Sequence, residues 1–268
     1  MIRVAEIRLY PVKGLHGRAV PHAAVEPWGL AGDRRFMVVA PGGRFVTQRE
    51  LPAMARVEAA LLPGGIALSM PGRGRLDVAE PPAGAPPVAA TIFRDTVPAR
   101  DAGEAAAAWL SAALGRPCRL VHMAEPATAR RVSPSSGSAD HVSFADGFPV
   151  LLTGTASLAD LNGRLQCPVG MDRFRANVAV AGAPAWAEDR WAGLRIGDVA
   201  FNGAEGCGRC AVPTVDQDTG VKADDQEPLR TLASFRRAAD GRVVFGLNLI
   251  PRGGGRIAVG DPVTVLPA

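Results

Sequence analysis

Two cysteines separated by two residues form the most distinctive local pattern of the chain. They stand at the ends of the segment CGRC at positions 207–210, whereas Cys118 and Cys167 lie far away in the sequence. A redox pair of the thioredoxin type needs a helix that begins at the first cysteine and lowers its pKa. Pro213 and the turn-forming residues after it argue against such a helix. A structural zinc site needs two further ligands, for which the isolated cysteines are weak candidates.

Spacing alone leaves two other interpretations of the pair open. One cysteine could supply a thiolate to a soft metal, and the adjacent Arg209 would favour the charged form of the sulfur. The two cysteines could equally be small buried residues of a loop.

Basic residues gather at turns in the N-terminal third of the chain. Lys13 stands beside Gly14 at the end of a strand-like segment, Arg34 and Arg35 begin the next apolar run, and Arg49 ends the one after it. Cations beside a glycine turn suit a phosphate, because backbone N–H groups and positive side chains can converge there. Each residue taken singly is more often a surface charge than a phosphate ligand.

Two expected strands in the C-terminal half carry polar side chains on one face. A strand over 174–181 would place Arg175 and Asn177 together, opposite an apolar face. A strand over 243–250 would place Gly246 beside Asn248, a combination that marks either the close approach of a ligand or a bulge. For both strands, a solvated outer face is the alternative to a binding surface.

Composition excludes several classes of protein. The chain has 268 residues, 30 Lys+Arg against 26 Asp+Glu, and 47% hydrophobic residues, enough for a sizeable core. It has no run of five like charges, so we expect no nucleic-acid partner. Its apolar runs fall far short of the roughly 20 residues of a membrane span, and its start lacks a secretory pattern. We therefore expect a cytoplasmic protein without a membrane partner.

The 31 glycines and 23 prolines indicate many turns between short strands. The polar segment 128–140 is expected to be a mobile loop, either a domain boundary or a lid over a site. Helices are expected over 103–114, 157–165 and 228–237. Further strands are expected over 34–40, 44–49, 65–70, 76–79, 119–123, 194–201 and 261–266. These elements predict a mainly β (α+β) protein in which short strands close into barrels and a few helices pack outside.

With these residues in view, the chain resembles the MOSC superfamily, which is named for the C-terminal domain of molybdenum-cofactor sulfurases. More narrowly, it resembles the amidoxime-reducing proteins and their bacterial relatives. The segments that carry the resemblance are YPVKG (10–14), GDRRFMVV (32–39), FVTQRE (45–50), FADGFPVLLTGTASLADLN (144–162), FRANVAV (174–180), CGRCAVPTVDQDTG (207–220), EPLRTLASFR (227–236) and GDPVTVL (260–266). The resemblance implies an N-terminal MOSC-type β-barrel domain over 1–120 and a MOSC β-barrel domain over 121–268.

The resemblance also implies a molybdenum-pterin cofactor (Mo-molybdopterin). One protein cysteine would ligate the metal, and the family motif assigns that role to Cys210, with Cys207 as a neighbour. Asp146 and Gly147 would approach the cofactor through their backbone. Together with the basic groups above, the predicted cofactor-binding residues are Lys13, Gly14, Arg34, Arg35, Arg49, Asp146, Gly147, Arg175, Asn177, Gly208, Arg209 and Asn248.

The implied activity is the reduction of small N-hydroxylated compounds, namely amidoximes, hydroxylamines and N-hydroxylated bases. The chain has no iron–sulfur pattern of the form C-x₄-C-x₂-C, so electrons are expected from separate proteins, of ferredoxin or cytochrome type with a flavin reductase. Asp216 is a candidate proton donor or a turn-capping residue. The alternative function is that of a carrier that binds molybdenum cofactor, or sulfur on a cysteine, and passes it on.

Overall fold

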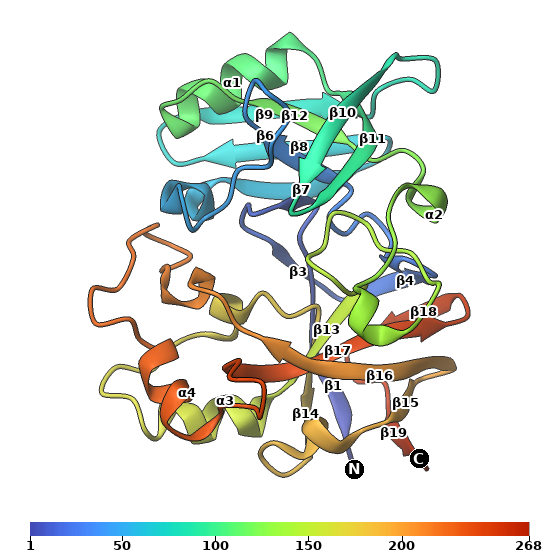
Figure 1. The fold of residues 1–268 in the computed structure, drawn as a ribbon, viewed down its shortest axis with the longest axis vertical. Helices are drawn as coiled ribbons and strands as arrows, with labels where there is room; N and C mark the ends of the chain where they lie inside the picture. The colour runs from blue at the N-terminus through green and yellow to red at the C-terminus, as the bar shows by residue number, and fades with distance from the viewer. Residues whose placement is uncertain (268) are drawn as a thin grey trace.

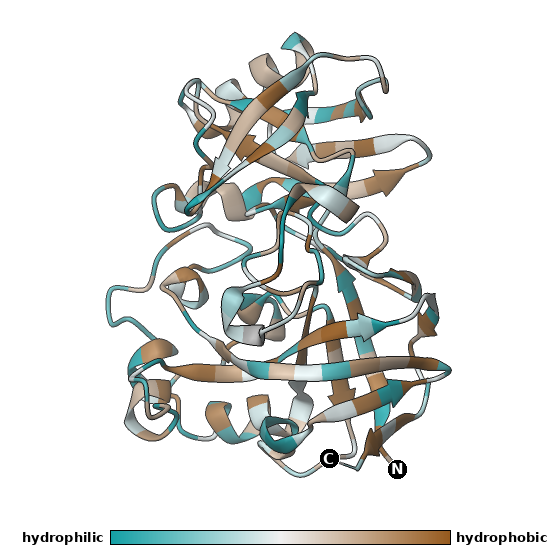
Figure 2. Ribbon diagram, turned by 45° about the vertical axis from the view of Figure 1, so that its right-hand side comes forward, coloured by the Kyte–Doolittle hydropathy of each residue, from teal (hydrophilic) through white to brown (hydrophobic). Residues whose placement is uncertain are grey.

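The chain folds into two β-rich bodies stacked along its long axis, with both ends of the chain at the foot of the lower body (Figure 1). The computed structural model describes residues 1–267. In both bodies the hydrophobic residues concentrate along the strands, whereas the connecting loops are largely hydrophilic (Figure 2). The mainly β architecture predicted from the turn-rich composition is confirmed.

The upper body contains a five-stranded sheet in the order β10-β11-β12-β6-β2 and a three-stranded sheet in the order β7-β8-β9. Its strands are β2 (Val12–Lys13), β6 (Phe36–Val39), β7 (Glu58–Leu62), β8 (Gly65–Met70), β9 (Gly74–Ala79), β10 (Pro87–Ile92), β11 (Asp95–Asp101) and β12 (Arg119–His122). Helix α1 (Glu104–Leu114) covers this body and buries Ala106 and Leu110 against it. Gly115 ends the helix in the left-handed conformation, as the sequence indicated.

The lower body is built on an eight-stranded sheet in the order β19-β15-β16-β17-β13-β14-β1-β3, with a small sheet β18-β4-β5 beside it. Its strands are β1 (Arg3–Leu9), β3 (Arg18–Val20), β4 (His22–Glu26), β5 (Gly29–Leu30), β13 (Val150–Gly154), β14 (Val178–Ala181), β15 (Gly193–Ile196), β16 (Val199–Gly208), β17 (Val244–Arg252), β18 (Gly255–Ala258) and β19 (Val263–Leu266). Large aliphatic side chains from these strands, together with Phe201 and Trp191, form its core.

The first strand of the chain belongs to the lower body, because β1 pairs with β14 from the C-terminal half. The chain therefore leaves the lower body near residues 10–14, returns to it, and leaves again near residues 31–36. A hydrogen bond of 2.8 Å from Tyr10 N to Asp33 Oδ1 ties the two crossings together. Lys13 and Arg34, two of the predicted site residues, lie on these crossings and so at the junction of the two bodies.

The remaining helices are short. Helices α3 (Thr155–Asn162) and α4 (Leu229–Phe235) pack Leu161 and Leu232 against Phe174 and Phe245 on the lower body. Helix α2 (Pro126–Ala129) lies between the bodies. The 3₁₀ helices are Pro52–Arg56, Pro134–Ser136, Met171–Phe174, Ala187–Arg190 and Val212–Thr214. None of the helices within residues 1–267 has the length and apolar character needed to cross a membrane.

The strand expected over 174–181 is wrong in its first half. Residues 171–174 form a 3₁₀ helix, Arg175 adopts the left-handed conformation with φ of 55°, and β14 begins only at Val178. The side chain of Phe174 stacks on Phe245 at 3.9 Å between ring centroids. This packing stabilises a turn where alternation alone favours a strand.

The polar segment 128–140 also contains structure that its composition did not indicate. It includes the end of α2 and the 3₁₀ helix at 134–136, and the side chains of Arg130 and Val132 are buried. The guanidinium of Arg130 donates hydrogen bonds to the backbone oxygens of Ala145 at 2.5 Å and of Asp146 at 2.6 Å. The segment is therefore anchored to the chain that carries Asp146.

Candidate functional site

A cavity of about 430 Å³ lies at the junction of the two bodies and is lined by residues from both. Lys13, Thr47 and Gln48 come from the crossings and the upper body, whereas Arg175 and Cys210 come from the lower body. The charged residues of the lining are mostly cationic: Lys13, Arg34, Arg49, Arg175, Arg209 and Arg242, against Asp146 and Glu205. The cavity is therefore suited to an anionic ligand.

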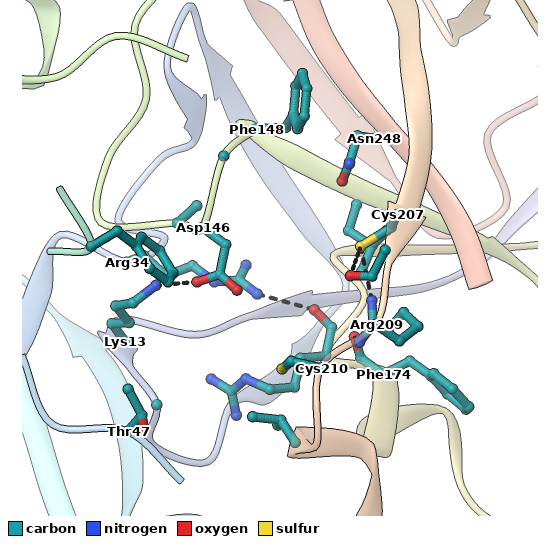
Figure 3. A pocket seen from close by; sticks show the side chains of 18 of the residues that line it. Lys13, Arg34, Thr47, Asp146, Phe148, Phe174, Cys207, Arg209, Cys210 and Asn248 are labelled. Atoms are coloured by element: carbon teal, nitrogen blue, oxygen red, sulfur yellow. Dashed lines mark hydrogen bonds and ion pairs between the residues drawn. The ribbon is translucent and has the colours of Figure 1, made fainter. Parts of the chain in front are cut away.

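Lys13 and Asp146 form an ion pair on one wall of this cavity (Figure 3). Lys13 is only 8% exposed, and this burial lowers the pKa of its ammonium group although Asp146 opposes the shift. Burial raises the pKa of the Asp146 carboxyl, but Lys13, Arg34 and Arg130 outweigh it, so the pKa lies below its usual range. The carboxylate consequently stays charged at neutral pH.

Arg34 connects the upper crossing to the lower body. Its guanidinium donates hydrogen bonds to Asp33 Oδ2 at 2.6 Å, Asn177 Oδ1 at 2.9 Å and the backbone oxygen of Arg175 at 3.0 Å. It also lies 4.4 Å from the centroid of the Tyr10 ring. These contacts hold the amide of Asn177 and the backbone of Arg175 in place.

Arg175 is directed into the cavity by its own backbone conformation. Burial lowers the pKa of its guanidinium to about 10, with the charge of Arg34 acting in the same direction and Tyr10 opposing it. Its guanidinium lies 4.3 Å from the Tyr10 ring, and Nη1 is 3.5 Å from Gln217 Oε1. Its Nη2 is buried and has no hydrogen-bond partner.

Three residues that line the cavity each have a buried polar atom without a partner within the described part of the chain: Arg175 Nη2, Arg209 Nε and Thr47 Oγ1. A buried donor without an acceptor is costly and is rare in folded proteins, most of all when it is charged. Two of these donors belong to cations. The arrangement fits a ligand that brings negatively charged oxygen atoms into the cavity.

The cysteine pair lies on the wall opposite Lys13, where β16 ends. Two register shifts interrupt the pairing of β16 with β17, at residues 203–205 and 206–208. Such bulges re-aim side chains, and here Cys207 and Cys210 both line the cavity. Gly246 allows this arrangement on β17, because it has φ of 85° and a Cβ at this position would lie 2.7 Å from the backbone oxygen of Leu152.

Arg209 organises the loop between the two sulfur atoms. Its Nη1 donates a hydrogen bond to Cys207 Sγ at 3.0 Å, and its Nη2 donates to the backbone oxygen of Phe174 at 2.7 Å (Figure 3). Burial raises the pKa of the Cys207 thiol, although Arg209 opposes the shift. The structure therefore differentiates the two cysteines, since Cys207 is held by the arginine and Cys210 is not.

The structure does not assemble the zinc site that four cysteines could form. Cys118 is buried in the upper body beside Ser111, and Cys167 is exposed. Within residues 1–267, no three side chains of His, Cys, Asp or Glu lie close enough to hold a metal ion. A protein-only metal site is thus not formed, whereas a metal that brings most of its own ligands needs only one cysteine.

The predicted site residues that line the cavity are Lys13, Gly14, Arg34, Arg49, Asp146, Gly147, Arg175, Asn177, Gly208, Arg209, Cys210 and Asn248. Arg35 is the exception. Its guanidinium donates to the backbone oxygens of Met123 at 2.8 Å and Ala124 at 3.1 Å, on the opposite side of the chain. The reason is local, because Arg34 has φ of 47° and β6 begins at Phe36, so the two consecutive arginines point apart.

The role of Asp146 differs from expectation, and that of Asp216 is decided between two expected roles. Asp146 presents its side chain to the cavity and not only its backbone. Asp216 does not line the cavity; its carboxylate accepts hydrogen bonds from Thr219 N at 2.8 Å and Arg173 Nη2 at 2.9 Å. It is a turn-capping residue, which was one of its two expected roles.

Sequence reasoning missed several residues of the site. Thr47 and Gln48 precede Arg49 in the segment FVTQRE, and Phe93 lies at a hairpin tip with no motif around it. Glu205 and Arg242 face each other at the cavity with a 3.0 Å ion pair, although they are 37 positions apart in the chain. The polar pair before Arg49 was the one available signal, since a polar segment between apolar strands suggests a functional edge.

Comparison with known proteins gives two family matches in chain order. Residues 1–117 match the MOSC N-terminal beta barrel domain, and residues 139–264 match the MOSC domain. Mitochondrial amidoxime-reducing component 1 of Mus musculus is 34% identical over 98% of this chain and 82% of that protein, and the Homo sapiens protein of the same name is 33% identical with the same coverage. Molybdenum cofactor sulfurase of Oryza sativa is 30% identical over 92% of this chain but only 32% of that protein.

Proposed function

Because the chain belongs to the family that combines a MOSC N-terminal β-barrel domain with a MOSC domain, we propose that it is a molybdenum-cofactor-dependent reductase of N-hydroxylated compounds. Amidoximes, hydroxylamines and N-hydroxylated bases are the substrate class. The names of its mouse and human relatives support this activity. One observation carries the proposal: unpartnered cationic donors and the sulfur of Cys210 line the same cavity.

The residues of the cavity fit such a cofactor in charge and in ligand type. A phosphorylated pterin is anionic, and the free donors of Arg175 and Arg209 would supply hydrogen bonds that the protein itself leaves unused. Lys13 and Arg34 would add positive charge from the other side of the junction. Cys210 would be the protein ligand to the metal, because a thiolate suits a soft metal.

When bound, the cofactor supplies a two-electron couple, with which an N–OH compound, two electrons and two protons give the N–H compound and water. The residues of the chain bind and orient the cofactor and the substrate for this reaction. Arg209 holds the CGRC loop against Phe174 and so orients Cys210. Asp146, whose pKa the neighbouring cations hold below its usual range, accepts a hydrogen bond from Lys13 and holds that ammonium group at the cavity wall.

The proposal includes separate electron-transfer proteins, of ferredoxin or cytochrome type with a flavin reductase, and the cytoplasm as the compartment. The carrier function remains the alternative, because the same cavity would hold a cofactor that is passed on.

Two measurements on one preparation test the proposal. The protein is purified from a host that makes the cofactor, and its molybdenum and zinc are quantified per chain. It is then given benzamidoxime and a chemically reduced dye without oxygen. We expect close to one molybdenum per chain and continued formation of benzamidine. Stoichiometric release of cofactor without turnover would favour the carrier, and zinc in place of molybdenum would contradict both functions.

A further inference from the structure

Phe93 occupies a backbone conformation that its side chain disfavours. It is the first residue of the two-residue loop between β10 and β11, whose strands pair from Ile92 with Asp95. Its φ is 53°, and Arg94 beside it has no positive φ. This is the pattern of a type II′ turn, in which glycine is the usual first residue because a Cβ is crowded there. A bulky aromatic residue in this region is a true outlier.

The ring of Phe93 is not needed by the core of the upper body. Ile92 and Phe45 belong to that core, whereas Phe93 is 45% exposed. Its ring lines the cavity and lies 5.0 Å from the Phe45 ring, at an interplanar angle of 60°. The ammonium group of Lys13 is 5.4 Å from its centroid. A strained hairpin thus presents a partly exposed aromatic ring to a cavity whose charged lining residues are mostly cationic.

Strained residues persist where the surrounding structure holds them, and they cluster at ligand sites. A single exposed apolar residue needs no explanation by itself. Here the strain and the position in the cavity are independent observations, and both concern the same side chain. The free part of the ring can accept another flat ring in an offset or tilted stack, as aromatic pairs prefer.

We infer that Phe93, backed by Phe45, is a specificity-determining residue on which the aromatic ring of a substrate stacks. The inference rests on the proposed function, and it narrows the preferred substrates to N-hydroxylated compounds that carry a planar aromatic ring. An aliphatic N-hydroxylated compound enters the same cavity without this contact. The discrimination between the two classes comes from Phe93 and not from the groups that hold the cofactor.

Equilibrium binding without an electron donor tests this inference separately from turnover. The cofactor-loaded protein is titrated calorimetrically with benzamidoxime and with acetamidoxime, which carry the same reacting group on an aromatic and an aliphatic frame. Three variants are compared with the unaltered protein: Phe93→Gly, Phe93→Leu and Arg94→Gly. Glycine adopts the turn without strain, so Phe93→Gly is expected to fold and to melt at no lower temperature. Arg94→Gly is the matched control in the same turn.

We expect the unaltered protein to bind benzamidoxime more tightly than acetamidoxime. Phe93→Gly should weaken benzamidoxime binding about three- to tenfold, the range of an aromatic pair, and leave acetamidoxime binding and the molybdenum content unchanged. Phe93→Leu should fall between, and Arg94→Gly should match the unaltered protein.

Unchanged benzamidoxime binding in Phe93→Gly would overturn the inference. So would an equal loss for both ligands together with a loss of molybdenum, because Phe93 would then contact the cofactor. If the selective binding is seen but no variant, nor the unaltered protein, reduces either compound when the reduced dye is added, the proposed function fails while the aromatic subsite stands.

Discussion

The side-chain amides of Gln48 and Gln217 form a reciprocal pair of hydrogen bonds across the junction of the two bodies. Gln48 Nε2 donates to Gln217 Oε1 at 3.2 Å, and Gln217 Nε2 donates to Gln48 Oε1 at 3.1 Å. The two residues are 1% and 2% exposed. Gln48 also donates to the backbone oxygen of Gly14 at 2.8 Å, and Arg175 approaches Gln217. One amide pair therefore links the Lys13–Gly14 crossing to the loop that follows Cys210.

We predict that this pair is energetically coupled. Gln48→Ala and Gln217→Ala should each lower the free energy of unfolding by about 1–3 kcal/mol, because each leaves a buried amide without its partner. The double variant should lose less than the sum of the two. Denaturant unfolding measures the cycle, and Gln166→Ala, at an exposed glutamine, is the control that should change little. Strict additivity would show that the amides do not interact.

The two cysteines are expected to differ in function. Cys210→Ser should fold normally and lose the reductase activity, because a hydroxyl is a poor ligand for a soft metal. Cys207→Ser alters a sulfur that faces the same cavity and contacts Arg209, so it serves as the matched control and should keep the molybdenum. Metal analysis and the dye-linked assay on both variants measure the difference. Full activity in Cys210→Ser would end the assignment of this residue as the metal ligand.

Two adjacent arginines allow a direct test of the site geometry. Arg34→Ala removes a cavity cation that also holds Asn177 and the backbone of Arg175, so cofactor content should fall sharply. Arg35→Ala removes hydrogen bonds to Met123 and Ala124, so it should lower the melting temperature but not the cofactor content of the folded protein. Phosphopterin content per folded chain is the measurement. Equal loss of cofactor in both variants would contradict the geometry.

His122 makes the stability of the upper body depend on pH. Burial, with the charges of Arg35 and Arg100, lowers its pKa from 6.5 to about 4, and neither ring nitrogen has a hydrogen-bond partner. Between these two pH values the His122 imidazole is protonated in the unfolded chain and neutral in the folded chain. The free energy of unfolding should therefore fall as the pH drops from 6.5 toward 4.

Replacement of this histidine isolates its contribution. His122→Leu should reduce the slope of the free energy of unfolding against pH by the equivalent of up to one bound proton. Denaturant unfolding at several pH values measures this slope. His22→Gln, at an exposed histidine, should leave the slope as it is. An identical slope in His122→Leu and the unaltered protein would mean that His122 titrates normally in the fold.

Local sequence patterns correctly predicted elements whose structure does not depend on contacts with residues far away in the chain. Helix α1 begins one residue later than expected and ends as expected, and β8 has the expected bounds. The failures occur where distant contacts override a local pattern. Alternation favoured a strand at Arg175, but Phe174 packs on Phe245, 71 positions later in the chain, and the backbone turns instead.

The sequence by itself determined the turn-rich β architecture, the family, and the residue types that could bind an anionic cofactor through one cysteine. Only the tertiary structure decided which of them meet. The sequence does not distinguish the roles of the consecutive residues Arg34 and Arg35. The positive φ of Arg34 places their side chains on opposite sides of the chain. Phe93 lies in no sequence motif, and Gln48 and Gln217 lie in two separate motif segments that say nothing of their pairing. Their roles depend on a cavity that forms only where β1 pairs with β14 and the two bodies meet.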